Sequence, residues 1–195
     1  MDEKTATRDR ILQAASARIV HYGYGKTTMA EIAADCAMSP GNIYRFFEAK
    51  IDIAEAMARQ HYAVKFEEVA ALARRKDKPA DWRLREIFLT RLRDNFAMVS
   101  ANAKVLEVAE VLRRERPLFA AQNQAQERVW LAALIHEGVE AGLFQPCEAE
   151  FVAEMMQAAT SKYTLSHVFA NTPLAKLERE LNGVLDLIFN GIYAR

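Results

Sequence analysis

The sequence predicts an all-α fold for this chain of 195 residues. Apolar residues recur at helical spacing almost throughout, and no run of alternating β-branched residues is bounded by turn residues. The chain contains only seven glycines and five prolines, a composition that favours long helices. Because 51% of the residues are hydrophobic, the helices have enough apolar side chains to build a core.

The first two predicted helices are joined by a glycine-containing loop. The first ends at the glycines of residues 23–25, and its inward stripe consists of Ile11, Leu12, Ala15 and Ile19. The second begins where Thr28 and Glu31 have the spacing of a capping box, and it ends near residues 35–36. Another short helix follows closely, and two short helices joined by a tight turn indicate a helix-turn-helix motif.

The stretch SPGNIYRFFEAK (residues 39–50) begins with residues that start this third helix. Ser39 is a favoured N-cap, and Pro40 is tolerated in the first helical turn because its missing N–H would have no partner there. Gly41 leaves space for a ligand, and the free amides at a helix N-terminus suit a phosphate. The abrupt start therefore predicts a helix whose first turn lies against an anion.

The side chains of the third helix divide into an inward and an outward set. Ile43 and Phe47 are four residues apart and face the preceding helix. Asn42, Tyr44 and Arg45 face outward, and these residue types bind base edges or phosphates of DNA. We therefore expect this helix to read DNA.

Net charge does not identify a nucleic-acid partner, because 26 basic residues balance 26 acidic ones. Residues 4–50 carry seven basic and four acidic residues, a small excess that supports DNA binding only weakly. Arg8 and Arg10 precede the first apolar stripe. They either reach phosphates or the minor groove, as basic arms do, or are simply solvated.

The rest of the chain predicts longer helices, for about nine helices in total. The expected spans are residues 51–75, 82–100, 104–114, 117–142, 148–169 and 173–193. Gly142 followed by Leu143 and Phe144 predicts a Schellman-type helix end, and Pro146 prevents continuation. The longest apolar run, residues 129–135, is too short to cross a membrane, and the charged N-terminus lacks the apolar segment of a secretory signal. Two distant cysteines form no disulfide framework, so we expect a cytoplasmic protein.

Several elements occur together in residues 11–53, namely Ile11-Leu12, Ala14-Ala15, Tyr22-Gly23-Tyr24, Thr27-Thr28-Met29, Ile32-Ala33, Ser39-Pro40-Gly41, Ile43-Tyr44-Arg45-Phe46-Phe47 and Lys50. In this combination they resemble the N-terminal domain of TetR-family transcriptional regulators. The resemblance implies a three-helix DNA-binding domain in residues 1–50 and a larger helical domain in residues 51–195. In that family the larger domain binds a small-molecule inducer and forms a homodimer through its last two helices.

The resemblance also implies particular contacts with double-stranded DNA. Thr27, Thr28, Tyr44 and Lys50 would contact phosphate, and the segment of residues 40–45 would enter the major groove. The DNA-binding residues expected in total are Thr27, Thr28, Ser39, Pro40, Gly41, Asn42, Tyr44, Arg45 and Lys50.

Two positions depart from the family pattern. Glycine is usual in the turn where this chain has Ala37, which predicts a strained or altered turn. Arg18 stands where an aliphatic residue is common, which predicts a loosely packed first helix or an outward-pointing side chain.

The last predicted helix has apolar residues at alternating spacings of three and four, like the seam of a coiled coil. These residues are Leu174, Leu177, Leu181, Val184 and Ile188. A lone helix cannot bury such a stripe, and Gly183 and Gly191 permit close approach, so we expect a homodimer. Its paired recognition helices would lie about 34–36 Å apart and match a pseudo-palindromic operator. The alternative is an internal core helix.

Residues of the larger domain that are candidates for an effector pocket are Phe88, Leu92, Phe96, Trp130, Leu134, Met155, Met156 and Tyr163, with His136 or His167 as a polar contact. They favour an apolar or amphipathic small molecule. Aromatic and methionine stripes are also typical of an ordinary core.

An enzyme is the rival class of protein. His136 and Glu140 share a helix face, but the second histidine of a zinc-protease motif is missing. The sequence contains no phosphate-binding glycine loop and no nucleophile elbow, and a redox role for Cys147 would need a depressed pKa. We therefore expect no catalytic residue, metal or cofactor, and interpret the chain as a repressor released by its effector. A regulator without an inducer remains the alternative.

Overall fold

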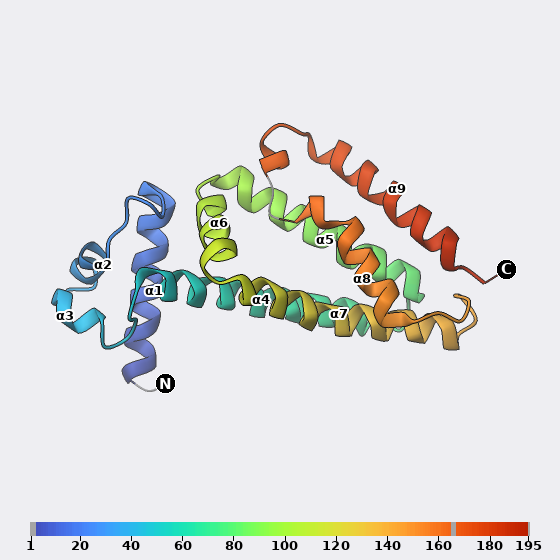
Figure 1. The fold of residues 1–195 in the computed structure, drawn as a ribbon, viewed down its shortest axis with the longest axis horizontal. Helices are drawn as coiled ribbons and strands as arrows, with labels where there is room; N and C mark the ends of the chain where they lie inside the picture. The colour runs from blue at the N-terminus through green and yellow to red at the C-terminus, as the bar shows by residue number, and fades with distance from the viewer. Residues whose placement is uncertain (1–2, 165–166, 195) are drawn as a thin grey trace. The chain divides into compact units, whose positions relative to one another are not determined.

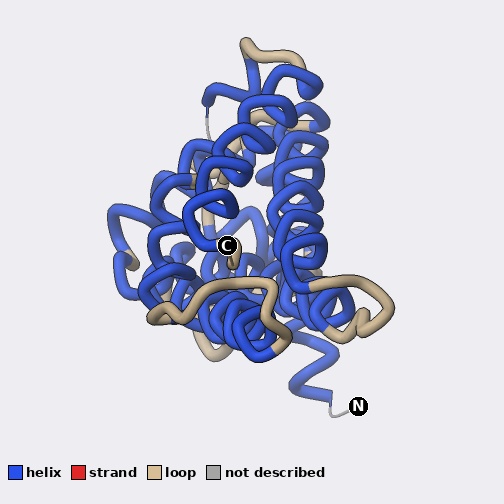
Figure 2. Tube along the Cα trace, turned by 90° about the vertical axis from the view of Figure 1, so that its right-hand side faces the viewer, coloured by secondary structure: helices blue, strands red, loops and turns tan. Residues whose placement is uncertain are grey.

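The computed structural model describes residues 3–164 and 167–194, and the all-α prediction is confirmed for them (Figure 2). The helices are α1 (Glu3–Tyr22), α2 (Met29–Asp35), α3 (Pro40–Ile43), α4 (Lys50–Ala73), α5 (Ala80–Ala101), α6 (Val105–Glu115), α7 (Pro117–Glu140), α8 (Ala149–Ala159) and α9 (Leu174–Ile192). Two short 3-10 helices, η1 (Ser161–Tyr163) and η2 (His167–Ala170), lie between α8 and α9. Within the described ranges, no helix is both long and apolar enough to pass through a bilayer.

The chain forms two compact units. The first unit comprises residues 1–63 and 102–120, so that α6 joins α1, α2, α3 and the beginning of α4. The second comprises residues 64–101 and 121–195, with α5, α8 and α9. The functional boundary expected at residue 50 remains a prediction.

The core of the first unit contains the apolar stripe that the sequence predicted for α1. Its side chains are all buried: Ile11, Leu12, Ala15 and Ile19. Three of them pack with Ile32 and Ala33 of α2 and with Ile43 and Phe47 around α3. Figure 1 shows α2 and α3 lying beside α1. Hydrophobic burial therefore assembles the three N-terminal helices into one body.

The core of the second unit is formed largely by α5 and α9, which lie side by side. Leu84 and Leu92 of α5 are fully buried, as are Leu177 and Leu181 of α9. One charged group is also buried there: Arg83 is 2% exposed and donates from Nη1 to the carbonyl oxygen of Ala73 at 2.8 Å. Its guanidinium also binds Glu137 and, through this hydrogen bond, lowers the pKa of that carboxyl to about 2.

The ends of two helices show how local chemistry sets their length. Gly142 has φ +70°, and the amide of Leu143 donates to the carbonyl of Gly138 at 2.9 Å, so the predicted Schellman-type end of α7 is confirmed. The helix expected over residues 148–169 is wrong beyond residue 159. The Thr160 hydroxyl donates to the carbonyl oxygen of Met156 at 2.7 Å, and the chain then tightens into η1. Residues 165–166 lie outside the described residues.

Candidate nucleic-acid interface

The start of α2 is fixed by the predicted capping box. The amide of Glu31 donates to Oγ1 of Thr28 at 3.3 Å, and the amide of Thr28 donates to Oε2 of Glu31 at 2.9 Å. These bonds satisfy amides that a helix start would otherwise leave unpaired. The Thr28 hydroxyl also donates to Oε2 of Glu31 at 2.7 Å, and these bonds lower the pKa of that carboxyl.

The turn between α2 and α3 is strained, as the sequence predicted. Ala37 has φ +53°, in the left-handed region that favours glycine. The turn is closed by the amide of Met38, which donates to the carbonyl of Ala33 at 2.9 Å. Ala37 thus adopts a backbone conformation that glycine reaches without strain, and its Cβ makes this conformation unfavourable.

The third helix, α3, is only four residues long and has Pro40 in its first turn. Ser39 precedes it in an extended conformation, and its hydroxyl makes no capping hydrogen bond. Ile43 and Phe47 hold the segment to the core, with exposed fractions of 0% and 3%. The predicted inward set of this helix is therefore confirmed.

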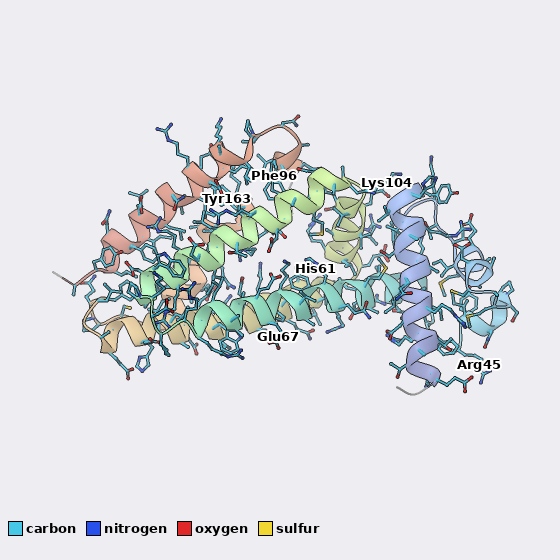
Figure 3. All side chains as sticks on the ribbon, turned by 180° about the vertical axis from the view of Figure 1, so that it is seen from behind. Arg45, His61, Glu67, Phe96, Lys104 and Tyr163 are labelled. Atoms are coloured by element: carbon cyan, nitrogen blue, oxygen red, sulfur yellow. The ribbon has the colours of Figure 1, made fainter. Side chains whose placement is uncertain are left out.

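The opposite side of this segment faces solvent. We call it the reader surface, and it consists of Ser39, Pro40, Gly41, Asn42, Tyr44 and Arg45. Asn42 is half-buried and the others are exposed, Tyr44 by 53%. Figure 3 shows Arg45 at the outside of this segment. The structure therefore brings together six of the nine residues expected to bind DNA, with amide, phenol and guanidinium groups on one short surface.

Thr27 and Lys50 lie apart from the reader surface and use their polar atoms within the protein. Thr27 is 1% exposed, and its hydroxyl donates to the carbonyl of Gly23 at 2.9 Å. The ammonium of Lys50 donates to the carbonyl oxygens of Tyr24 at 2.7 Å and Thr27 at 2.6 Å. It also lies 4.2 Å from the centre of the Tyr24 ring, and burial lowers the pKa of Lys50. Phosphate contacts for these two residues stay predictions.

Two arginines of α1 also bind neighbouring helices. Nη1 of Arg8 donates to the carbonyl oxygen of Phe46 at 3.2 Å, and its guanidinium lies 4.1 Å from the centre of the Phe47 ring. Arg18 binds Asp35 through Nε and through Nη2, the latter at 3.0 Å, and lowers the pKa of that carboxyl by this hydrogen bonding. The sequence predicted either a loosely packed α1 or an outward-pointing side chain at Arg18; in the structure Arg18 is half-buried and links α1 to α2.

Residues near α6 hold the end of α1, which sequence reasoning did not predict. Asn102 donates from Nδ2 to the carbonyl oxygen of Val20 at 2.7 Å, and Nζ of Lys104 donates to the carbonyl oxygen of His21. Figure 3 shows Lys104 beside this end of α1. The last carbonyls of a helix lack intrahelical partners, so a lysine and an amide are suitable caps. The partners are far apart in sequence, and no local pattern could have linked them.

An ion-pair cluster in the same unit joins the start of α7 to α4. Arg116 binds Asp52 at 2.7 Å and Glu55 at 3.1 Å. Asp52 also accepts a hydrogen bond from the amide of Ala49 at 2.9 Å, so the same carboxylate caps the start of α4. Residues near both ends of α6 are therefore bonded to α1 and α4, the helices that precede and follow α2 and α3 in the chain.

The predicted effector residues divide between the interior and the surface of the second unit. Five are buried: Phe88, Leu92, Leu134, Met156 and Tyr163. Phe96 and Trp130 are half-buried, and the Phe96 ring lies 6.0 Å from that of Phe169. Met155, His136 and His167 are exposed. Nε2 of His136 lies 3.4 Å from Oε1 of Glu140 on the surface of α7. The candidates for an effector pocket in the interior are therefore the buried residues of the set.

The predicted dimerisation residues of α9 also divide into two sets. Leu177 and Leu181 are buried within the chain, whereas Leu174, Val184 and Ile188 are half-buried. Sequence reasoning missed Leu187, which is 77% exposed. It lies four residues after Gly183, a spacing that places both on one helix face.

Comparison with known proteins connects this geometry to a family. Residues 11–57, which contain α2, α3 and most of α1, match the family model described as bacterial regulatory proteins, tetR family. In this segment the chain is similar to the TetR family. No curated protein sequence matches the chain. Regulators of the TetR family bind DNA and control transcription, and the reader surface lies within their matching segment.

Solved structures show the same TetR-like fold over nearly the whole chain. A TetR/AcrR-family regulator from Thermobifida fusca has 18% identity and a TM-score of 0.71, with 96% of this chain and 98% of that chain covered. FadR from Bacillus subtilis in complex with stearoyl-CoA has 19% identity and a TM-score of 0.70, with 95% and 99% covered. SmeT, the repressor of the Stenotrophomonas maltophilia efflux pump SmeDEF, has 18% identity and a TM-score of 0.69, with 98% and 93% covered.

The strain at Ala37 predicts a stabilising substitution. Ala37→Gly should raise the free energy of unfolding by about 1 kcal/mol, because glycine adopts positive φ without the clash of a Cβ. Urea denaturation of the whole protein measures the change. Ala34→Gly is the control: it places glycine inside α2 and should lower stability by about 0.5–1 kcal/mol. Equal destabilisation by both variants would contradict the assignment of strain.

Proposed function

We propose that this TetR-family protein is a dimeric repressor in the cytoplasm. It binds a pseudo-palindromic operator in double-stranded DNA and is released by a small apolar or amphipathic molecule. The observation that carries the DNA-binding part is the exposed reader surface on a segment held to the core by Ile43 and Phe47. A rigidly anchored set of polar side chains is what sequence-specific readout requires.

Each exposed group of the reader surface has a chemical partner on DNA. The amide of Asn42 suits the edge of adenine, and the guanidinium of Arg45 suits guanine or a phosphate. The phenol of Tyr44 suits a phosphate oxygen. Because Gly41 has no atoms within 4 Å of an added Cβ, the backbone there is open to close approach. The segment therefore fits the major groove.

The dimer is supported by apolar side chains exposed on the last two helices. Phe151 and Met155 are four residues apart on α8, with exposed fractions of 56% and 41%. Leu187 is exposed on α9, and Gly183 one turn before it leaves open space around its Cα. Exposed apolar residues on adjacent helices are typical of a protein interface. Leu187 therefore lies on a different face of α9 from Leu177, which is buried in the core.

The effector class is supported by the interior of the second unit and by two neighbouring structures. Its buried residues include Phe88, Met156 and Tyr163, which suit an apolar or amphipathic compound. FadR is bound to stearoyl-CoA, and SmeT represses a multidrug efflux pump. By analogy, we infer that this chain binds a long-chain acyl compound or a similar apolar molecule.

Release from DNA requires that the effector prefers one conformation over another. In the first unit, Lys104 and Arg116, near the two ends of α6, bind the end of α1 and the start of α4 respectively. A displacement of α6 would therefore alter contacts with α1 and α4, the helices before and after the segment that carries the reader surface. We infer that these contacts transmit the effector signal.

If Arg45 reads a base, Arg45→Ala should weaken operator binding by about 1–3 kcal/mol and relax preference at one operator position, because it removes that base contact. Fluorescence anisotropy measures both effects, with an operator duplex first identified by selection of bound DNA fragments and with its single-base variants. Arg113→Ala is the control, since Arg113 is exposed on α6 and pairs with Glu110 in the same helix. Unchanged affinity and preference for Arg45→Ala would remove this residue from the reader.

Leu187→Glu should weaken dimerisation at least about tenfold, because it places a charge in an apolar contact. Sedimentation velocity across a concentration series measures the dissociation constant. Leu118→Glu serves as the control, since Leu118 is 74% exposed at the start of α7. A wild-type protein that is monomeric at micromolar concentration would overturn the proposed dimer.

Long-chain acyl compounds should raise the thermal midpoint and release labelled operator, because a ligand at 100 times its dissociation constant stabilises its binding state by about 2.7 kcal/mol. A thermal-shift screen followed by displacement of operator DNA provides the measurement, with short polar acids as the comparison. Stabilisation by polar compounds alone would contradict the effector class. Failure of every compound to release DNA would favour a regulator without an inducer.

A further inference from the structure

Among the residues that the structure describes, only two buried side-chain polar atoms lack a hydrogen-bond partner. They are Nε of Arg83 and Nε of Arg91, both on α5 in the second unit. Buried donors in proteins are almost always paired, so an unpaired one needs an explanation. Arg91 precedes Leu92, a predicted effector residue, and its guanidinium lies 4.8 Å from the centre of the ring of another, Phe88. The unpaired donor of Arg91 therefore lies where an effector is expected.

We propose that the effector carries an uncharged hydrogen-bond acceptor, such as an ester or thioester carbonyl, and that Nε of Arg91 donates to it. This inference rests on the proposed function and deepens it, because it names the polar group of an otherwise apolar effector. It also assigns a binding role to an arginine that the sequence did not single out.

The other two nitrogen atoms of the Arg91 guanidinium are bound to the protein. Nη1 donates to both carboxylate oxygens of Glu127 on α7, at 3.0 and 2.9 Å. Nη2 donates to the hydroxyl oxygen of Thr160 at 3.1 Å. These contacts hold the guanidinium in one orientation, and they leave Nε as the nitrogen that no described residue binds.

The partners of Arg91 are themselves bonded to predicted effector residues. Thr160 is fully buried, and its hydroxyl donates to the carbonyl oxygen of Met156 at 2.7 Å. The amide of Tyr163 donates to the carbonyl oxygen of Thr160 at 2.9 Å. Three of the five buried candidates, Phe88, Met156 and Tyr163, are thus in contact with Arg91 or Thr160. An effector that binds against these three residues lies close to the guanidinium.

The carboxylate of Glu127 neutralises Arg91 and is held in place by further bonds. Its side chain is only 12% exposed, and it also accepts from Nε2 of Gln157 at 3.0 Å. The same Nε2 donates to the carbonyl oxygen of Gln124 at 2.9 Å, and Oε1 of Gln157 accepts from Nε of Arg128 at 3.1 Å. The buried charge is therefore already paired before any effector binds.

This paired charge decides which acceptor fits Nε. A carboxylate placed there would lie near the carboxylate of Glu127, and like charges repel strongly in a buried site. An uncharged carbonyl accepts the bond without that repulsion, and a hydrogen bond from a charged donor is stronger than one between neutral groups. A purely alkyl compound would leave the donor unpaired. The site therefore selects esters, thioesters, ketones or amides over free acids.

The burial of Nε also gives the effector a reason to prefer one conformation. An acceptor can reach this atom only after the side chains that cover it have moved apart. An effector bonded to Nε therefore binds the altered conformation more tightly than the free one. That difference in affinity is what release from DNA requires.

Methyl laurate and laurate test the assignment, because they share a hydrocarbon chain and differ in the charge of the head group. Their dissociation constants are measured with the whole protein by tryptophan fluorescence at neutral pH, where a carboxylic acid is ionised. Each compound is also tested for release of labelled operator. Thermal melting without ligand shows whether each variant is folded.

Three variants accompany the wild type. Arg91→Lys keeps the positive charge beside Glu127 and places a methylene where Nε stands. Arg83→Lys makes the same exchange at the other unpaired donor and is the matched control. Glu127→Gln removes the carboxylate that neutralises Arg91 and keeps a side chain of similar size.

We expect wild type to bind methyl laurate at least about tenfold more tightly than laurate. Arg91→Lys should weaken the binding of methyl laurate about tenfold, because one hydrogen bond from a charged donor is lost. Arg83→Lys should leave this affinity unchanged. Glu127→Gln should shift the ratio of the two affinities at least about tenfold toward laurate, because Arg91 then carries an unpaired charge.

Wild-type affinity of Arg91→Lys for methyl laurate overturns the proposal, and so does an equal loss of affinity in both arginine variants. A wild type that binds laurate as tightly as methyl laurate also overturns it, and this comparison decides the matter even if no variant folds. Failure of the proposed effector class has a different signature: wild type then binds neither compound, and the proposal fails with it.

Discussion

The burial of Ile43 and Phe47 is the interaction on which the DNA-binding segment depends. A helix of four residues cannot be stable in isolation, because nucleation costs more than so few hydrogen bonds return. Apolar contact with α1 and α2 replaces that missing stability. It also fixes which side chains face outward, since Asn42 and Arg45 lie on positions that the core does not use. The same contact therefore provides both order and orientation.

Within the first unit, charged side chains link the elements of this arrangement, although the chain as a whole carries no net charge. Arg18 joins α1 to α2, Arg8 binds the turn after α3, and Lys50 holds the loop before α2. The chain has no net charge, so its attraction to DNA must come from a few exposed cations. Dividing the cations between internal bonds and the exposed surface allows a neutral protein to present a local positive charge.

The last helix, α9, combines a buried apolar face with an exposed apolar side chain. Leu177, Leu181, Leu185 and Phe189 complete the core of the second unit, and Leu187 points to solvent on another face. A buried face alone would explain a single-chain fold. The additional exposed leucine, close to the open surface of Gly183, is what a fold built for a partner would retain.

Local patterns in the amino-acid sequence were sufficient for the helical class, the α2 capping box, the turn at Ala37 and the inward set of α3, because each depends on neighbours within a few residues. They were insufficient for Arg18, Lys50 and Asn102, whose partners lie on other elements. They also failed at Thr160, where a side-chain hydrogen bond accompanies the end of a helix that propensity would continue. A long charged side chain can reach several alternative partners. Only the packing of helices distant in sequence decides whether its charged group binds another part of the protein or stays free for DNA.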